Sequence, residues 1–262
     1  MLHSKDKLAT TLRQMLHGTR RFTRRVTSRA REVLHKSTLP PALADVAGAV
    51  RTSGLTYLSP MKLDKLGAAV LRIEARGVPG AIIETGCALG GSAILMASAK
   101  ARSRPMRVYD VFGMIPPPSA ADGVDVHRRY AVIQSGRSKG LRGDTYYGYQ
   151  KNVLEQVKQS FARFSLDEAL DLVEFVPGLI EDTLVATGPV ALAHIDVDWH
   201  APVKTSLERI LPQLSPGGVV VLDDYFDWSG CHRATDEVLA ATSIRFERDA
   251  SSGSLALWRV SP

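Results

Sequence analysis

Apolar residues in this chain form short continuous runs that alternate with segments of helical periodicity. A helix is expected over a stretch that includes Met61–Glu74. The runs that follow are short enough for strands, and strands that alternate with helices are typical of a parallel β-sheet. The five expected strands lie at Ala81–Glu84, Arg107–Phe112, Val173–Val176, Val190–Val197 and Gly218–Leu222.

Two further apolar runs lie near the end of the sequence, at Ile244–Glu247 and Leu255–Val260. The link between them, residues 249–253, is short and rich in turn-forming residues, which favours an antiparallel hairpin. Five alternating strands and a terminal hairpin predict an α/β fold with a doubly wound, Rossmann-like sheet of seven mostly parallel strands.

The first 40 residues differ from the rest in charge. Residues 1–36 hold ten Lys or Arg against Asp6 and Glu32, a net +8, so the remainder of a chain with total charge +6 carries −2. Apolar residues recur here at spacings typical of an amphipathic helix, at Leu8, Leu12, Met15, Phe22, Val26, Ala30 and Val33. We expect a helical arm over residues 1–40 that packs on the domain or a partner subunit. Attraction to a membrane surface or an anionic substrate is the alternative.

Length and composition indicate one catalytic domain over residues 41–262. A chain of 262 residues that is 45% hydrophobic can bury one large core. No apolar run reaches the roughly 20 residues needed to span a bilayer, and the start lacks the apolar centre of a secretory signal. Two cysteines, Cys87 and Cys231, form no disulfide framework. We therefore expect a soluble, cytoplasmic protein.

One segment, residues 113–149, does not follow the strand–helix alternation. It contains Pro116-Pro117-Pro118 and the cluster Tyr146-Tyr147-Gly148-Tyr149, and it is too long for an ordinary connection. Long structured loops in compact domains are usually lids or binding loops. The segment is therefore predicted to be a lid or substrate loop inserted in the domain.

A glycine-rich turn follows the first strand, in the sequence Glu84-Thr85-Gly86-Cys87-Ala88-Leu89-Gly90-Gly91-Ser92. Glycines let backbone N–H groups approach a ligand, and the helix N-terminus that follows favours an anionic group. Ala88 stands where a dinucleotide fingerprint has its second glycine, which disfavours NAD. Asp110 lies near the end of the next strand, about where a ribose-binding carboxylate belongs; a capping or surface role is the alternative.

Four aspartates form the strongest candidate site: Asp196, Asp198, Asp223 and Asp224. They lie at the ends of two apolar strands, and such strands deliver their last residues to the edge of the sheet where ligands bind. Asp196 and Asp198 face the same way if the chain is extended. Four carboxylates repel one another unless a cation or protons intervene, and oxygen ligands favour Mg²⁺. Helix capping is the alternative, and it explains one of the four at most.

With these motifs the sequence resembles the macrocin O-methyltransferase family, which includes enzymes that methylate sugar hydroxyls on macrolides and aminocoumarins. The resemblance extends from about Leu58 to Val260. It rests on Glu84-Thr85-Gly86, Gly90-Gly91-Ser92, His194-Ile195-Asp196 with Asp198, Leu214-Ser215-Pro216-Gly217-Gly218, Asp223-Asp224-Tyr225, and Gly230-Cys231 with Ala234 and Asp236. It implies a class I methyltransferase fold, for which the terminal hairpin is typical, and the cofactor S-adenosylmethionine.

The resemblance also assigns roles. It implies that Asp196, Asp223 and Asp224 bind Mg²⁺ and that Asp198 is the general base. The residues expected to bind the cofactor are Glu84, Thr85, Gly86, Gly91, Ser92, Asp110, Glu181 and Asp182. The sequence departs from the family pattern at Trp199-His200, where an aliphatic residue and a tyrosine are expected, so His200 is a second candidate for the base.

The expected function is Mg²⁺-dependent O-methylation of a sugar hydroxyl in a glycoside, oligosaccharide or glycosylated natural product. Binding to Mg²⁺ lowers the pKa of the hydroxyl, and a carboxylate or imidazole takes the proton. Three alternatives remain: a catechol or phenol acceptor, nucleic-acid or membrane binding through the arm, and, last, a NAD-dependent oxidoreductase. A simple binder has no need of four aspartates, so no nucleic-acid partner is expected. The resemblance and the apolar stripe of the arm favour a homodimer.

Overall fold

The computed structural model describes residues 36–261. One compact unit begins at Thr38 and contains all the elements given below. Most of the arm predicted over residues 1–40 lies outside the described residues, so its helix, its contacts and the homodimer stay predictions. Within residues 36–261, no helix is long and apolar enough to cross a membrane.

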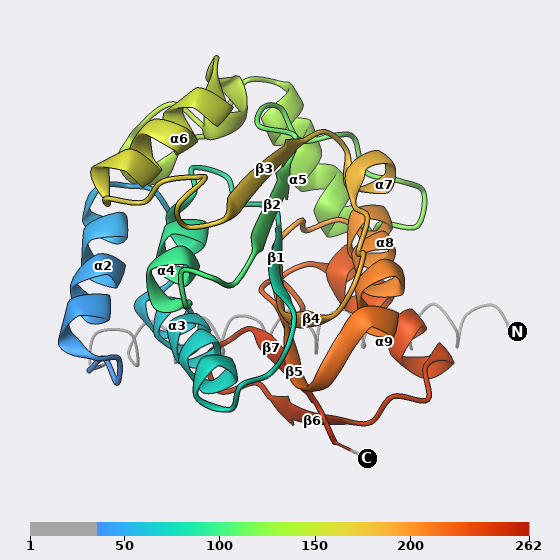
Figure 1. Cartoon of the computed structure of the whole chain (residues 1–262). Helices are drawn as coiled ribbons and strands as arrows, with labels where there is room; N and C mark the ends of the chain where they lie inside the picture. The colour runs from blue at the N-terminus through green and yellow to red at the C-terminus, as the bar shows by residue number, and fades with distance from the viewer. Residues whose placement is uncertain (1–35, 262) are drawn as a thin grey trace, which may run out of the picture. The chain divides into compact units, whose positions relative to one another are not determined.

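Seven strands form one sheet in the order β3-β2-β1-β4-β5-β7-β6 (Figure 1). Strand β7 runs antiparallel to both its neighbours, β5 and β6, whereas the other pairs are parallel. The strands are β1 Ala81–Thr85, β2 Met106–Asp110, β3 Val173–Pro177, β4 Val190–Ile195, β5 Leu214–Leu222, β6 Phe246–Asp249 and β7 Leu255–Arg259. The predicted seven-stranded, mostly parallel fold is confirmed.

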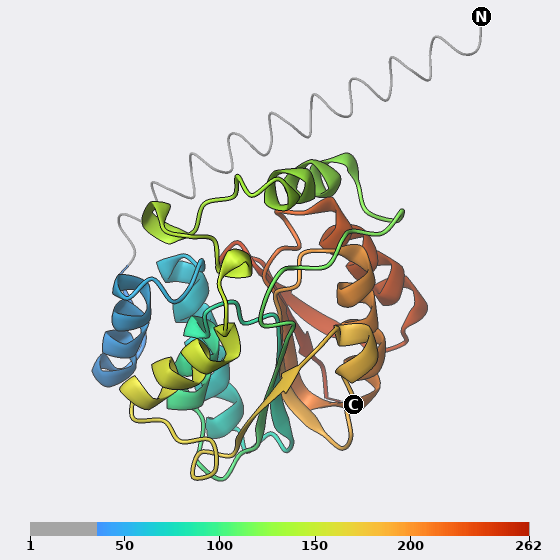
Figure 2. The ribbon, with the colours of Figure 1, turned by 90° about the horizontal axis from the view of Figure 1, so that it is seen from above.

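Helices cover both faces of this sheet (Figures 1 and 2). They are α2 Pro41–Thr52, α3 Pro60–Ala75, α4 Gly91–Ala99, α5 Val124–Gln134, α6 Val153–Arg163, α7 Ile180–Thr183, α8 His200–Ile210 and α9 Ser229–Ala241. Side chains of α2, α3, α4 and α6 share one apolar cluster with Ile82 of β1. Those of α7, α8 and α9 share a second cluster with Ile83. Successive strand residues thus face opposite cores, as the two-residue period of a strand requires.

Burial on both faces of the sheet explains why the central strands appear in the sequence as continuous apolar runs. All six residues of β4 are buried, because helices cover both of its faces. The strand ends at Ile195, two residues before the predicted end at Val197, and Asp198 then adopts a left-handed backbone conformation with φ +56°. The chain therefore leaves the sheet at Asp196, the first of the four predicted aspartates.

The segment 113–149 is folded. It contains α5 and the short 3₁₀ turns Leu141–Gly143 and Tyr147–Tyr149, and the Tyr149 hydroxyl donates to the carbonyl oxygen of Ile133 at 2.5 Å. Helix α5 lies beside α9 (Figure 2). Aromatic and apolar side chains hold the segment together, since Tyr146 and Ile133 are buried.

Candidate active site

A cavity lies where β1, β2 and β4 end, and the residues that line it come from the loops after these strands. Its polar lining includes Gly86, Asp110, Glu181, Asp196 and Asp198. Apolar residues of the segment 113–149, of α7 and of α8 complete the wall. Ligands of doubly wound folds bind in this crevice, so its position agrees with the prediction.

Gly86 lets the loops after β1 and β4 approach each other closely. Its φ is +83°, and a Cβ atom there would lie 2.0 Å from the carbonyl oxygen of Asp196. Only glycine fits this contact, because the obstacle is backbone and cannot move aside. The residue that opens the glycine-rich turn therefore also fixes the position of the acidic loop.

Asp110 is a central hydrogen-bond acceptor of the site. One carboxylate oxygen accepts the backbone N–H groups of Cys87 at 2.7 Å and Ala88 at 3.1 Å, and the other accepts that of Phe112 at 2.7 Å. Burial raises the pKa of Asp110, although these hydrogen bonds oppose the rise. The side chain thus supports the glycine-rich turn, and it also lines the cavity as a ribose-binding carboxylate would.

The other residues predicted to bind the cofactor divide into two groups. Glu181 lines the cavity, as Gly86 and Asp110 do. The remaining five do not line it: Glu84, Thr85, Gly91, Ser92 and Asp182. Gly91 uses its N–H group to bind the carbonyl oxygen of Leu55 at 3.0 Å, and Ser92 is buried in α4. The structure therefore brings three of the eight predicted residues to the cavity.

Glu84 pairs instead with His194 inside the sheet. Both side chains are fully buried, and Nδ1 of His194 lies 2.9 Å from Oε1 of Glu84. Burial disfavours the protonated ring, but Glu84 and the nearby Asp196 and Asp223 carboxylates raise the pKa of His194 above its usual value. His194 and Glu84 thus form a buried pair next to the acidic loops.

Three of the four aspartates form one cluster. Asp196, Asp198 and Asp224 each offer a carboxylate oxygen within 4.8 Å of the others, which is the spacing of ligands around one metal ion. Burial and the charge of Asp223 raise the pKa of Asp196 to about 7. Burial and the neighbouring carboxylates also raise the pKa of Asp224, whose Oδ2 atom is buried without a hydrogen-bond partner.

The fourth aspartate, Asp223, is occupied by other partners. Lys62 Nζ lies 2.8 Å from Asp223 Oδ2, and the Ser254 hydroxyl donates to Asp223 Oδ1 at 2.9 Å. Burial would raise the pKa of Asp223, but Lys62, with smaller contributions from His194 and Ser254, lowers that pKa below its usual value. The observed cluster thus contains Asp198 where the expected ligand set had Asp223.

Lys62 was not among the residues predicted for the site, and the position of Lys62 in the sequence explains why. It lies on α3, 161 residues before Asp223, in a helix whose other lysine, Lys65, is half exposed. A lysine on an amphipathic helix normally reaches solvent. Only the tertiary structure shows that this one crosses to the end of β5.

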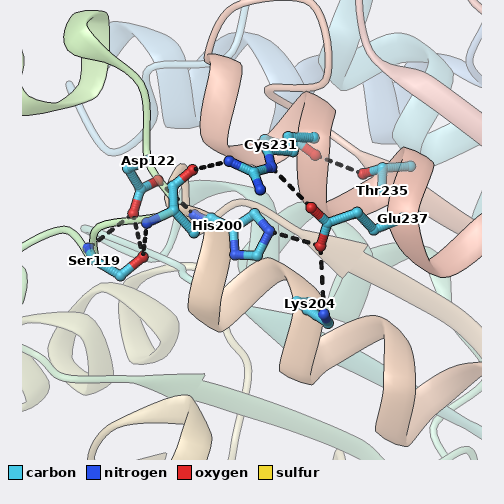
Figure 3. Close-up of polar contacts among 9 residues, drawn as sticks. Ser119, Asp122, His200, Lys204, Cys231, Thr235 and Glu237 are labelled. Atoms are coloured by element: carbon cyan, nitrogen blue, oxygen red, sulfur yellow. Dashed lines mark hydrogen bonds and ion pairs between the residues drawn. The ribbon is translucent and has the colours of Figure 1, made fainter.

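His200 does not face the acidic cluster. Its imidazole Nε2 lies 3.0 Å from Glu237 Oε2, and Lys204 reaches the same oxygen at 3.3 Å (Figure 3). Arg233 and His200 lower the pKa of Glu237 to about 2, so this partner is ionised. The alternative that made His200 the base is not supported by this geometry, because its ring is held on the α9 side of α8 by an anion.

The comparisons with known proteins agree with this geometry. Residues 4–259 match the family described as macrocin-O-methyltransferase (TylF). A tetracenomycin-C rhamnosyl 4'-O-methyltransferase of Streptomyces olivaceus is 34% identical over 210 residues, 78% of this chain and 75% of the relative. The demethyldecarbamoylnovobiocin O-methyltransferase of Streptomyces niveus is 29% identical over 205 residues, 73% of this chain and 70% of the relative.

Among solved structures, the O-methyltransferase NovP superimposes with a TM-score of 0.68 at 26% identity, over 84% of this chain and 97% of NovP. The similarity to the fold of NovP and the family match are both consistent with the acidic cluster that lies beside the glycine-rich turn of this chain. The chain therefore belongs to the macrocin-O-methyltransferase family and is an O-methyltransferase.

Proposed function

We propose that this enzyme transfers the methyl group of S-adenosylmethionine to a sugar hydroxyl of a glycosylated natural product, with the help of Mg²⁺. The observation that carries this proposal is the cluster of Asp196, Asp198 and Asp224, two of which line the cavity beside Gly86 and Asp110. The name of the Streptomyces olivaceus relative describes a rhamnosyl derivative of tetracenomycin C as its acceptor, and this supports a sugar acceptor.

The cavity fits an adenosine-containing cofactor. Its wall combines apolar residues, Val111, Leu179 and Ile180, with the carboxylates of Asp110 and Glu181. Apolar surfaces suit a purine ring, and carboxylates suit the two ribose hydroxyls. When bound, the cofactor supplies a methyl group that its sulfonium already activates. The residues of the cavity would orient this group toward the acceptor and exclude water.

The acidic cluster fits a hard divalent cation. It offers oxygen atoms alone, and Asp224 Oδ2 is buried without any partner, as an unfilled ligand atom would be. Asp196 and Asp224 are the more suitable ligands. When bound, Mg²⁺ would lower the pKa of an acceptor hydroxyl.

Asp198 is the residue that takes the proton from the acceptor. It lines the cavity, and burial raises its pKa, which brings the carboxylate closer to the neutral range where a general base is most effective. Asp224, its neighbour in the cluster, is the more deeply buried of the two. This difference in exposure supports the proposal that Asp198 serves the substrate and Asp224 the cation.

The test is an assay for S-adenosylhomocysteine formation with glycosides and with catechols as acceptors. We expect turnover with glycosides that EDTA abolishes. Turnover with catechols alone would transfer the enzyme to the phenol-methylating class, and full activity in EDTA would refute the role of Mg²⁺. Binding of NAD without binding of S-adenosylhomocysteine, measured by calorimetry, would contradict the cofactor assignment.

A further inference from the structure

Helix α8 starts directly after the acidic loop but has no capping side chain of its own. Trp199 occupies the N-cap position, and an indole can donate a hydrogen bond but cannot accept one from the first N–H groups of a helix. The cap comes from the segment 113–149: Asp122 Oδ1 accepts the backbone N–H of His200 at 2.7 Å in a buried position (Figure 3). Ser119 orients this carboxylate by donating its N–H and its hydroxyl to Oδ2.

The same segment also binds the residue between Asp198 and His200. The indole N–H of Trp199 donates to the carbonyl oxygen of Pro116 at 3.1 Å, and Trp199 is 2% exposed. Both residues after Asp198 are therefore fixed by residues 116–122. This matters because Asp198 has a φ of +56°, a conformation that is unfavourable for a non-glycine residue and persists only where its surroundings impose it.

Gly230 in α9 makes room for this contact. A Cβ atom at Gly230 would lie 2.2 Å from Asp122 Oδ1 and 2.9 Å from the N atom of His200. Its backbone is not left-handed, so the position requires glycine for space and not for conformation. The sequence motif Gly230-Cys231, which none of the proposed catalytic roles uses, thus has a structural reason.

Two side chains of α9 connect the segment 113–149 with the imidazole of His200, so that the contacts form a closed ring. Arg233 of α9 donates to the carbonyl oxygen of Ala121 at 3.2 Å and to Glu237 Oε1 at 2.8 Å, and Glu237 in turn holds the imidazole of His200. Figure 3 shows Asp122 and Glu237 on either side of His200 in the first turn of α8. The main chain of His200 is bound by Asp122 and its side chain by Glu237, so the start of α8 is fixed from two sides.

We propose that Asp122, which belongs to the segment 113–149, is a positioning residue. It holds the turn at Asp198 in its reactive conformation. Asp122 is not among the residues that line the cavity; it acts by capping α8 two residues after Asp198. The consequence for catalysis rests on the proposed function of Asp198, whereas the structural coupling does not.

The test compares Asp122→Ala with Asp125→Ala. Asp125 is a matched control, since it also anchors the segment 113–149, but to the N–H and hydroxyl of Ser229 in α9 and not to α8. Hydrogen–deuterium exchange resolved to the His200 amide reports on the cap directly. We expect exchange to rise about tenfold or more in Asp122→Ala, the effect of losing one charge-assisted hydrogen bond. Asp125→Ala should change it by less than about twofold.

Two further variants separate positioning from a general loss of folding. Asp122→Asn keeps one acceptor oxygen for His200 but turns its amide NH₂ toward the N–H of Ser119, so it should restore slow exchange in part, to a level between those of Asp122→Ala and the wild type. Gly230→Ala should raise exchange as Asp122→Ala does, although alanine is the better helix former. Its effect should be smaller when Asp122 is already alanine, because the two variants disrupt the same contact and only the approach to the His200 main chain at 2.9 Å then remains.

The functional readout uses Mg²⁺ alone as the probe, titrated by calorimetry. Asp122→Ala should weaken Mg²⁺ binding several-fold, and Asp125→Ala should not. Asp198 is not one of the proposed ligands, but its carboxylate lies within 4.8 Å of those of Asp196 and Asp224, so its negative charge attracts the cation only while the turn is held in place. Unchanged exchange at His200 in Asp122→Ala, or an equal rise in Asp125→Ala, would overturn the proposal, and so would Mg²⁺ binding to Asp122→Ala at wild-type affinity. A wild-type protein that binds no Mg²⁺ would instead refute the metal-dependent function, and the exchange measurements would still decide the role of Asp122.

Discussion

Replacing Lys62 with methionine removes the one positive charge that directly contacts Asp223 among the ion pairs of residues 36–261. Methionine keeps most of the apolar stem, so the change isolates the ammonium group. Lys62 also donates to the backbone carbonyl oxygen of Asp223 at 3.1 Å and to Asp227 at 3.3 Å. The variant therefore leaves a carboxylate unpaired beside three others.

The loss can be estimated from the geometry. At 2.8 Å and an effective dielectric constant near 20, the Coulomb energy of the pair is about 6 kcal/mol, an upper bound. Removing one partner of a buried pair typically costs about 3–5 kcal/mol. The side chains of Lys62 and Asp223 are 15% and 8% exposed, so slight contact with water favours the lower end. We expect Lys62→Met to lower the free energy of unfolding by about 3 kcal/mol, or roughly 6–12 °C in melting temperature.

The effect must depend on pH with a definite sign. In the wild type Lys62 lowers the pKa of Asp223, so this pair stabilises the fold fully above the unfolded pKa of Asp223 and less as pH falls through the folded pKa. Without Lys62, burial and the neighbouring carboxylates raise that pKa. Protonation in the folded state then removes the unpaired charge, and the difference between variant and wild type should shrink from pH 8 to pH 5.

Chemical and thermal unfolding at both pH values without divalent cations measure this difference. Lys65→Met is the control, because Lys65 and Asp249 are 3.7 Å apart and each nearly half exposed. That variant should change the free energy of unfolding by less than about 0.5 kcal/mol. A Lys62→Met loss below about 1 kcal/mol, or a loss that grows on acidification, would refute the electrostatic account.

Three further predictions concern the cavity itself. Asp110→Ala should weaken S-adenosylhomocysteine binding about 10- to 100-fold in calorimetry, because the glycine-rich turn loses its acceptor; unchanged affinity would limit Asp110 to folding. Mg²⁺ at a hundredfold excess over its Kd should stabilise the wild type by about 2.7 kcal/mol and Asp224→Ala much less. This shift should be larger at pH 8 than at pH 6, because protons compete for Asp196, whose pKa is about 7. Asp198→Asn should abolish methyl transfer while His200→Ala retains most of it, and the reverse result would make His200 the base.

The fold was predictable because its signals are local. Each central strand is buried on both faces, so it appears as an apolar run that needs no knowledge of its partners. The hairpin link of residues 249–253 is turn-rich for the same local reason. Strand ends were less predictable: β5 begins at Leu214, four residues before the expected Gly218, because Ser215 is tied to the Pro79 carbonyl oxygen near the start of β1.

The candidate site was predictable only in part, because its partners come from distant segments. The carboxyl ends of β4 and β5 are neighbours in any such sheet, so the meeting of Asp196 with Asp224 followed from topology. An extended chain was assumed for Asp196 and Asp198, whereas the chain turns sharply at Asp198. Residues such as Lys62 and Asp122 carry no local signal of their role, since a lysine on a helix and an aspartate in a loop are ordinary at a surface.

The charges around the site explain why three aspartates, and not four, remain uncompensated. Lys62 neutralises Asp223, and His194 pairs with Glu84, so these four groups form two compensated pairs. No salt bridge within residues 36–261 involves Asp196, Asp198 or Asp224. Burial without compensation raises the pKa of each of the three, which means that the folded protein binds protons there more tightly than the unfolded chain does. A divalent cation competes for the same oxygens, so the strain that raises these pKa values is also the source of its affinity.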